Sequence, residues 1–525
     1  MAGSYDVVVI GSGFGGAVVA ARLAEAGRSV CLLERGRRWE PADYPRSFSQ
    51  AERAVWDEAR NYGFLDYRVF RRLDVVQGSG VGGGSLHYFN VALRAPPPVF
   101  DRPEWPAAVT SEVLGPYYER VGAMIEARPL EAPAGERVPA RTRAFLVAAE
   151  RAGYDAHLVP IAVHTGPTRA HPVSGLTQEP CAYTADCLLG CRPRSKNSLD
   201  VTYLPWGEGK GLEIRPLHVA ERIEAFDDGY QVTSRRLDPD RPGSSERCRV
   251  RGHNLVLAAG TLGTSELLLT ARDTHRTLPR LPPTLGRRFS PNGDMIFAGT
   301  LDADTPVDPS HGPSITAGAF VQPPGSSHLI HVQDLGYPPA FTSLADGSVP
   351  TGKRLRSTLG AATSYVRAAR GGPPFRGALL FGGSFVPHCL PYLGMGTDAA
   401  DGRFSLDRHG QLSLDWNPIA SKPMFDEMEA AMRRLSGALG GDFMRSPPWR
   451  LPFRRLLTAH PLGGCVMSDS PHRGVVDHRG QVWGHPGLFV ADGSVVPGPL
   501  AVNPSLTIAA LAERTAHWMV HGREA

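Results

Sequence analysis

The first residues whose spacing suggests chemistry are Gly11-Ser12-Gly13-Phe14-Gly15-Gly16, which follow a short apolar run and open a helical stretch. In such a G-x-G-x-x-G pattern, Gly11 permits a tight turn, Gly13 lets the backbone approach a pyrophosphate, and Gly16 allows close packing of helix and strand. Glu34 lies 23 residues after Gly11, where a carboxylate can accept hydrogen bonds from an adenosine ribose. The pattern predicts a dinucleotide site and disfavours NADP, but by itself it does not separate NAD from FAD.

A second glycine-rich segment runs from Gly78 to Ser85 and includes Gly80, Gly83 and Gly84. Such a density of glycine lets backbone N–H groups approach a large planar or anionic ligand without clashes from Cβ atoms. The alternative is a flexible surface loop, but the apolar residues on both sides favour a packed loop.

Two further motifs lie near the C-terminus. One is Thr458 to Cys465, which contains His460, and the other is Leu488 to Ser494, which contains Asp492 and Gly493. The Asn503-Pro504 pair then predicts a helix start, with Pro504 as the first helical residue and Asn503 as its N-cap. The positive end of that helix would favour the negative charge of a reduced flavin.

The elements that must position these motifs can be placed from the periodicity of apolar residues. A strand over 5–10, a helix over 13–26 and a strand over 29–33 form a βαβ unit. Further helices are expected at 112–127, 140–152, 424–439 and 504–519, and a buried strand at 254–258. The fold class is therefore α/β (α+β overall), with a Rossmann-like domain built from discontinuous segments and an inserted, sheet-rich substrate domain that also has helices. The expected cofactor domain is 1–95, 180–300 and 455–525, and the expected substrate domain is 96–179 and 301–454.

Taken together, the motifs resemble the glucose–methanol–choline (GMC) family of flavin oxidoreductases, and most closely its cholesterol-oxidase-like branch. The matching segments run in the family's order and are Gly11–Gly16, Glu34, Gly80–Leu86, Val256–Leu268, Asn292-Gly293-Asp294, His460–Cys465, Asp492–Pro497 and Asn503-Pro504. The resemblance implies that FAD is the cofactor. The residues it implies for FAD binding are Gly11, Gly13, Phe14, Gly15, Gly16, Glu34, Gly78, Gly80, Gly83, Gly84, Ser85, His87, Val219, Ala259, Gly260, Asn292, Asp492, Gly493, Asn503 and Pro504.

The resemblance also implies a reaction, the oxidation of an alcohol to a ketone or aldehyde with hydride transfer to flavin N5. His460 would act as acid/base or hydrogen-bond donor at the substrate oxygen, and Asn503 would help to position the substrate. The alternatives without a catalytic role are that His460 is a buried structural histidine and that Asn503 only caps a helix. A bulky apolar alcohol such as a sterol or polyketide is the expected substrate, and O2 the expected electron acceptor. A dehydrogenase with another acceptor, and a lyase or non-redox flavoenzyme, remain as alternatives.

Two departures from steroid-oxidising members of the family bear on this reading. Those members use an additional glutamate to move a double bond, whereas the segment that corresponds loosely, Ser384 to Leu390, has no carboxylate and offers only His388 as a pocket residue. Isomerisation is therefore not expected. In addition, His87 lies two residues after Ser85, the spacing at which relatives with tethered flavin carry the reactive histidine. FAD is expected to bind non-covalently, with a histidyl bond to His87 as the alternative.

Three thiols at Cys181, Cys187 and Cys191 lie on one stretch of the sequence. They could bind zinc with a fourth ligand such as His171, but the usual C-x-x-C spacing is absent. Buried free thiols are the preferred interpretation, and no metal is expected.

Composition narrows the class of protein. The net charge is +4 over 525 residues, and basic residues occur in pairs rather than long runs, so no nucleic-acid partner is expected. No apolar stretch reaches the length of a membrane span, and the βαβ unit begins too early for a secretory signal. These features, with seven cysteines, predict a cytoplasmic protein without an integral membrane segment, whose oligomeric state the sequence leaves open.

Overall fold

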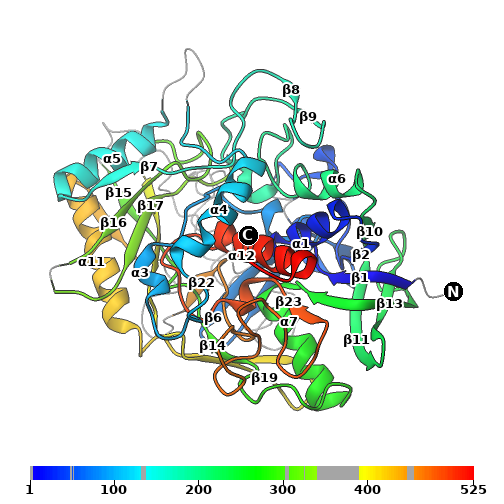
Figure 1. The fold of residues 1–525 in the computed structure, drawn as a ribbon. Coiled ribbons are helices and arrows are strands. Elements are labelled where there is room, and N and C mark those ends of the chain that lie inside the picture. Colours follow the sequence, from blue (N-terminus) through cyan, green and yellow to red (C-terminus); the bar gives the residue numbers. More distant parts are fainter. Residues whose placement is uncertain are drawn as a thin grey trace.

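In the computed structural model the described residues are 4–47, 50, 52–131, 138–301, 307–323, 325–339, 389–445 and 455–524. Two large sheets dominate them. In Figure 1 the sheet that contains β1 lies on the right and the sheet that contains β15 to β17 lies on the left, with α12 between them. This mixed arrangement confirms the predicted α/β class.

The seven-stranded sheet begins with the predicted βαβ unit. Its strands are β1 (Ser4–Ile10), β2 (Val30–Leu33), β10 (Glu213–Arg215), β11 (His218–Phe226), β12 (Gly229–Leu237), β13 (Ser245–Leu257) and β23 (Leu488–Val490). The order is β10-β2-β1-β13-β12-β11, and β23 also pairs with β13. The pairs among β10, β2, β1, β13 and β23 are parallel, whereas β11 and β12 form an antiparallel extension. The carboxyl ends of the parallel strands therefore meet at one edge, where ligands bind in open α/β sheets.

Helices from distant parts of the chain cover the parallel strands. They include α1 (Phe14–Glu25), α4 (Ser111–Met124), α6 (Tyr203–Glu208) and α12 (Ser505–His521), and α1 packs against both α6 and α12. Four apolar residues on one face of α1 are all buried, and they are Ala17, Ala20, Leu23 and Ala24. The half of the molecule that contains the seven-stranded sheet is thus assembled from segments at both ends of the chain.

The six-stranded sheet is antiparallel and has the order β21-β15-β18-β17-β16-β7. Its strands are β7 (Ala156–Leu158), β15 (Met295–Thr300), β16 (Ala317–Val321), β17 (Ile330–Asp334), β18 (Cys389–Gly396) and β21 (Asp442–Met444). The helices α5 (Ala140–Ala152) and α11 (Lys422–Ala438) pack on one of its faces. The domain boundaries proposed from the sequence stay a prediction, and β15 belongs to this sheet although it lies within the segment assigned to the cofactor domain.

Among the described residues, smaller sheets and several short helices surround the two large sheets. One sheet has the order β22-β6-β5 and the other β14-β19-β20. Their bounds are β5 (Leu65–Val69), β6 (Leu73–Gly78), β22 (Leu456–Thr458), β14 (Arg287–Phe289), β19 (Gly402–Leu406) and β20 (Leu412–Asp415), with α3 (Pro97–Phe100), α7 (Gly260–Leu269) and the single turn η3 (Gly83–Leu86). Two-stranded ribbons are formed by β3 (Trp56–Asp57) with β4 (Asn61–Tyr62) and by β8 (Arg169–Ala170) with β9 (Thr177–Gln178).

The predicted helices at 112–127, 140–152 and 424–439 are confirmed, within three residues at each end. The helix start near Asn503 is wrong by one residue. Helix α12 begins at Ser505 and Pro504 takes the capping position, so Asn503 is not the N-cap. Its side chain is bonded to Gln333 on β17 rather than to the backbone of the helix.

Candidate active site

Of the four glycines in the G-x-G-x-x-G pattern, three are required by the packing of the protein itself and Gly13 is not. A Cβ on Gly15 would lie 1.5 Å from the carbonyl oxygen of Ala491, and a Cβ on Gly16 would lie 1.9 Å from that of Gly11. These residues, and Gly11 with its φ of +99°, are glycine because the backbone of the protein occupies the space. A Cβ on Gly13, by contrast, would meet nothing nearer than 4.0 Å. Its missing side chain leaves room for a ligand, as close approach of a pyrophosphate requires.

The second glycine-rich segment packs directly on the first. A Cβ on Gly83 would lie 2.5 Å from the Cα atom of Gly13, and Gly83 has a φ of +53°. Ser12 joins the two loops, because its Oγ donates to the carbonyl of Gly80 at 3.1 Å and accepts from the N–H of Gly82 at 3.0 Å. Gly84 again has open space, since a Cβ there would meet only the Nε2 atom of His87, at 4.0 Å. The structure therefore confirms a packed loop here rather than a flexible one.

Glu34 stands at the end of β2, as predicted, and it is buried. Its carboxylate accepts hydrogen bonds from the N–H of Ser12 at 3.0 Å, the hydroxyl of Ser12 at 2.7 Å and the N–H of Gly36 at 2.9 Å. Burial raises the pKa of this carboxyl, and the donors from Gly36 and Ser12 lower it. Val219 on β11 lies close by, because the N–H of the preceding His218 donates to the carbonyl of Glu34 at 2.8 Å.

The third predicted group of cofactor residues surrounds Asp492. Its carboxylate accepts from the N–H of Ser494 at 2.9 Å and from the hydroxyls of Ser494 and Thr264, each at 2.5 Å. Thr264 Oγ1 in turn accepts from the N–H of Ala259 at 3.1 Å. This network ties the segment around Ala259 and Gly260 to the chain from Asp492 to Gly493, next to the Gly11 turn.

His460 is placed by a parallel strand pair. Strand β22 pairs with β6, with Thr458 opposite Val75, so the chain that leaves β22 reaches the edge where the Gly78–Ser85 segment begins. The Nδ1 atom of His460 lies 2.8 Å from Oδ1 of Asp294, a residue that is 2% exposed. Oδ2 of the same carboxylate accepts from Thr458 Oγ1 at 2.7 Å and from the N–H of Ala459 at 3.1 Å. Because a carboxylate can only accept, Nδ1 must carry a proton, so in the neutral ring Nε2 has the lone pair.

Asn503 is positioned by the same loop that holds His460. Two residues before Asp294, the side chain of Asn292 accepts from the N–H of Leu500 at 2.8 Å and donates to the carbonyl of Val502 at 2.9 Å. The backbones of Ser290 and Leu462 also exchange hydrogen bonds, at 2.9 and 3.0 Å. One loop, residues 290–294, therefore connects the two candidate catalytic segments.

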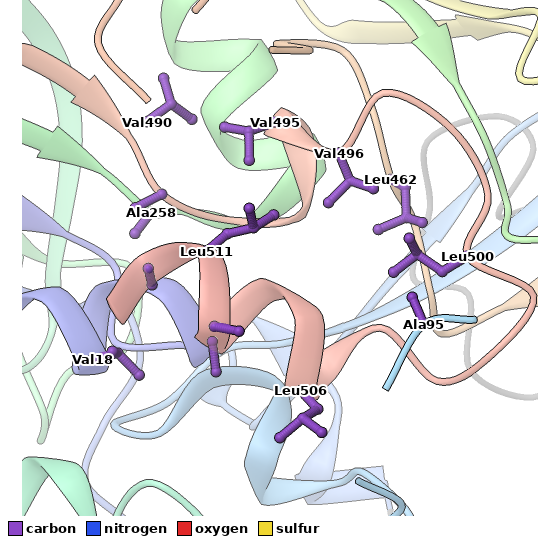
Figure 2. Close-up of a cluster of buried hydrophobic side chains, with 14 of the residues drawn as sticks. Val18, Ala95, Ala258, Leu462, Val490, Val495, Val496, Leu500, Leu506 and Leu511 are labelled. Atoms are coloured by element: carbon purple, nitrogen blue, oxygen red, sulfur yellow. The ribbon is translucent and has the colours of Figure 1, made fainter. Parts of the chain in front are cut away.

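A buried apolar cluster keeps these segments rigid. Figure 2 shows Leu462 beside Leu500, with Val495 and Val496 nearby and Leu506 and Leu511 on α12. Leu462 follows His460 by two residues, and Asn503 lies between Leu500 and Leu506. Close packing of this kind fixes the backbone from which both polar side chains project.

His87 lies fully buried beside Gly84, and its Nε2 atom has no hydrogen-bond partner among the described residues. Burial, together with the nearby charges of Lys196 and His460, lowers the pKa of His87 to about 3, so the imidazole is neutral. The ammonium of Lys196 donates to the carbonyls of Leu86 at 2.8 Å and Tyr88 at 3.4 Å, on both sides of His87, and to that of Cys187 at 2.9 Å. Ser79 Oγ is a second buried polar atom without a described partner.

These observations test whether the residues fit FAD. Open space at Gly13 and Gly84, two glycine loops in contact, and the unpartnered atoms of Ser79 and His87 form a cradle that the protein itself does not fill. Unpaired buried polar atoms are rare in proteins unless a ligand or water satisfies them. The donor set contains backbone N–H groups and neutral polar side chains, which suits a pyrophosphate and a flavin ring.

Comparison with known proteins agrees with this geometry. Models of the N- and C-terminal parts of the family described as GMC oxidoreductase match residues 5–289 and 401–512. The chain belongs to the GMC oxidoreductase family. It is 31% identical to a cholesterol oxidase of Mycobacterium tuberculosis over 98% of this chain and 90% of the relative. A long-chain-alcohol oxidase of Arabidopsis thaliana is 26% identical over 97% of this chain and 66% of the relative. The structure of a formate oxidase of Aspergillus oryzae superposes with a TM-score of 0.67 at 16% identity, covering 99% of this chain and 98% of that one.

Membership makes this GMC oxidoreductase an FAD-dependent enzyme that acts on alcohol groups, which confirms the family and the enzyme class expected from the sequence. The roles of individual residues stay predictions. In the sequence Asp294 belongs to a matching motif that indicates no role for it, and no motif contains Gln333 or Lys196. Asp294 could have been found, because a carboxylate in an Asn-Gly-Asp turn is a natural partner for a histidine. Gln333 lies in an ordinary strand and gives no local signal.

Several other predictions concern residues outside this site. Each of the seven cysteines is a free thiol, and in the described ranges no three His, Cys, Asp or Glu side chains are grouped so as to hold a metal ion. Cys187 accepts from Asn90 Nδ2 at 3.1 Å, and Cys191 lies 3.2 Å from Ser195 Oγ. The segment Ser384 to His388 lies outside the described residues. Within the part of the chain that is described, no helix has both the length and the apolar character needed to span a bilayer.

Proposed function

We propose that this GMC oxidoreductase oxidises the hydroxyl group of a bulky apolar alcohol to a carbonyl and passes the electrons to O2, giving H2O2. The observation that carries the proposal is the pair of His460 Nδ1 and Asp294 Oδ1 at 2.8 Å. This pair fixes the tautomer in which Nε2 is a base, and Nε2 has no hydrogen-bond partner among the described residues.

The residues perform distinct tasks in this reaction. When bound, FAD supplies the hydride acceptor at N5. His460 takes the hydroxyl proton on Nε2, and the carboxylate of Asp294 stabilises the resulting imidazolium through Nδ1–H. Asn503 donates an amide hydrogen to the substrate oxygen and holds it beside His460. The alcohol thus loses one proton to His460 and one hydride from carbon, and a carbonyl results.

The side chains of the six-stranded sheet nearest Gln333 are apolar. Leu393 and Met395 on β18 lie on the face turned away from α11, buried in a cluster that includes Val91 and Ile161. Two relatives carry names that specify a sterol and a long-chain alcohol, which share a hydroxyl on a large apolar body. Burial of such a body contributes roughly 25 cal/mol per Å² of apolar surface removed from water.

FAD is proposed to bind non-covalently through the two glycine loops, with His87 as the alternative point of attachment. A histidyl bond needs a neutral imidazole with a free nitrogen, and His87 offers both. Acid precipitation of the purified holoenzyme decides between these modes. Yellow colour in the supernatant supports non-covalent binding, and colour retained in the pellet but lost in a His87→Ala variant establishes the covalent bond.

Anaerobic mixing of the holoenzyme with cholesterol or with 1-dodecanol, each dispersed in detergent, tests the reaction. Bleaching of the visible flavin absorbance, followed by peroxide release on admitting air, is the expected result with at least one of them. Bleaching without peroxide would favour a dehydrogenase with another acceptor. Absence of bleaching with these and with a wider panel of primary and secondary alcohols would contradict the proposal and favour a lyase or other non-redox use of the flavin.

A further inference from the structure

The strand β17 carries a glutamine whose side chain reaches the active site from the opposite sheet. Gln333 is completely buried, and its Nε2 atom donates to Oδ1 of Asn503 at 2.8 Å. Its own Oε1 atom has no partner among the described residues. Buried side-chain amides usually form hydrogen bonds with the backbone or with other core groups. One that donates to a candidate catalytic residue requires an explanation.

The register of the sheet shows which face Gln333 occupies. Gln333 is opposite Leu393 on β18, and His331 is opposite Met395. A Cβ on Gly394 would lie 2.3 Å from the sulfur of Met428 on α11, so the residues that alternate with Leu393 and Met395 point toward that helix. Gln333 and His331 therefore lie on the face that is turned away from α11, among apolar neighbours, and the contact with Asn503 places that face toward the active site.

His331 is a second neighbour of the Gln333 amide. Its Nδ1 atom lies 3.3 Å from Gln333 Nε2. Burial lowers the pKa of His331 to about 3, so the ring is neutral and can offer Nδ1 as an acceptor. The two hydrogens of the Gln333 amide then go to His331 Nδ1 and Asn503 Oδ1. With His331 Nδ1 as an acceptor, this chain of contacts leaves Oδ1 of Asn503 as the acceptor of the second Gln333 amide hydrogen.

The orientation of Asn503 follows from this chain. Because Oδ1 is held by Gln333, the Nδ2 hydrogens are the group that Asn503 can present to a ligand, and Nδ2 has no acceptor among the described residues. If the amide were rotated by half a turn, Asn503 would present an oxygen to the substrate oxygen, and two acceptors would face each other. A donor at this position is what the proposed alcohol oxidation needs.

We propose that Gln333 is a positioning residue for alcohol oxidation, holding the amide of Asn503 so that its N–H groups face the substrate oxygen. The inference rests on the proposed function, since it assigns the task of Asn503 in that reaction. Gln333 contributes through Asn503, and its removal therefore affects turnover more than the binding of an apolar substrate.

A double-mutant cycle in the holoenzyme tests this assignment. Gln333→Met keeps the length of the side chain but cannot donate, and the cycle combines it with Asn503→Ala. Using whichever of cholesterol or 1-dodecanol is oxidised, we expect Gln333→Met to lower kcat about ten- to a hundredfold with little change in KM. In the Asn503→Ala background the same substitution should change kcat by no more than about twofold, because the residues act as a unit.

A second readout does not depend on turnover. In a crystal structure of the Gln333→Met variant, Oδ1 of Asn503 should no longer be directed toward residue 333. Gln231→Met is the matched control: Gln231 is a largely buried glutamine in the antiparallel extension that accepts from Arg251 Nε at 3.0 Å. The Gln231→Met variant should lose about as much thermal stability as Gln333→Met and keep the kcat of the wild-type enzyme. Melting temperature and FAD content of every variant separate loss of folding from loss of positioning.

Other outcomes would overturn the inference. Equal and additive effects of the two substitutions would show that Gln333 acts independently of Asn503. An unchanged kcat in Gln333→Met, with wild-type enzyme active, would refute positioning while leaving the proposed function intact. If none of the alcohols bleaches the flavin of the wild-type enzyme, the proposed function itself fails. This result is distinguishable because it is obtained before any variant is made.

Discussion

Replacement of Asp294 by asparagine should convert His460 from a base into a donor. The carboxylate accepts at both oxygens, from Nδ1 of His460 and from the hydroxyl of Thr458 and the N–H of Ala459. An asparagine has one oxygen and one NH2 group. Since the backbone N–H of Ala459 can only donate, the amide oxygen is drawn to that side and the NH2 group faces Nδ1. Nδ1 must then accept, Nε2 carries the proton, and the ring can no longer take one from the substrate.

The size of the effect follows from the contact that is lost. A hydrogen bond to a buried charged group is worth about 1.5–3 kcal/mol, so flavin reduction should slow by roughly 10- to 150-fold. The contacts with Thr458 and Ala459 can survive in the variant. The free energy of unfolding should therefore fall by no more than about 1.5 kcal/mol, the value of one hydrogen bond.

Stopped-flow measurement of anaerobic flavin reduction provides the assay, with the alcohol that the wild-type enzyme oxidises. Asp477→Asn is the control, because Asp477 is also buried and accepts from the N–H groups of Arg479 at 2.9 Å and Gln481 at 3.0 Å, in a turn outside the candidate catalytic residues. It should reduce stability without slowing reduction. An Asp294→Asn variant with full FAD content that reduces flavin within about twofold of wild type would refute the tautomer argument.

Three further predictions concern the cofactor cradle and the loop that supports it. Gly13→Ala should leave the thermal stability of the apoprotein intact and weaken FAD binding by at least about tenfold, as measured by fluorescence titration. Gly15→Ala, by contrast, should prevent folding because its Cβ would overlap a backbone carbonyl. Burial raises the pKa of Asp398 to about 6 from an ordinary value of 3.8, so the native state binds the proton more tightly than the unfolded chain and stability falls as pH rises between these values. Relative to Asp398→Asn, wild type should lose on the order of 3 kcal/mol of unfolding free energy from pH 3.5 to about 6.5 in denaturant titrations, and a parallel pH dependence of the two proteins would contradict this. Lys196→Met should lower the melting temperature and the FAD affinity together, because three buried carbonyls around His87 lose their donor; loss of stability with unchanged affinity would show that this lysine serves the fold alone.

How much of the fold could be predicted from the sequence depends on whether the interactions join residues that are near or distant along the chain. The βαβ unit and the helix at 140–152 were predictable, because their apolar periods and terminating glycines are local. The glycine loops were predictable for the same reason, since a turn or a close approach leaves its mark within a few residues. The helix start at Ser505 was misplaced because a local rule for Asn-Pro assigned Asn503 to capping, whereas a contact with Gln333, 170 residues away, takes its side chain.

The site shows the same division between local and distant effects. His460 and Asn503 belong to recognisable motifs, but the groups that orient them come from two other parts of the chain, the 290–294 loop and strand β17. In the proposed reaction, Asp294 selects the nitrogen of His460 that can accept a proton, and Gln333 selects the atom of Asn503 that faces the substrate. Both are buried polar side chains whose partners lie far away in the sequence. Asp294 at least belongs to a motif, whereas neither strand period nor composition reveals Gln333. A substitution of Gln333 would leave every motif in the sequence intact and still remove the donor that Asn503 accepts from. Motif matches alone are therefore insufficient to decide whether a member of this family is active, and the pairs formed by His460 with Asp294 and by Asn503 with Gln333 are the features to inspect.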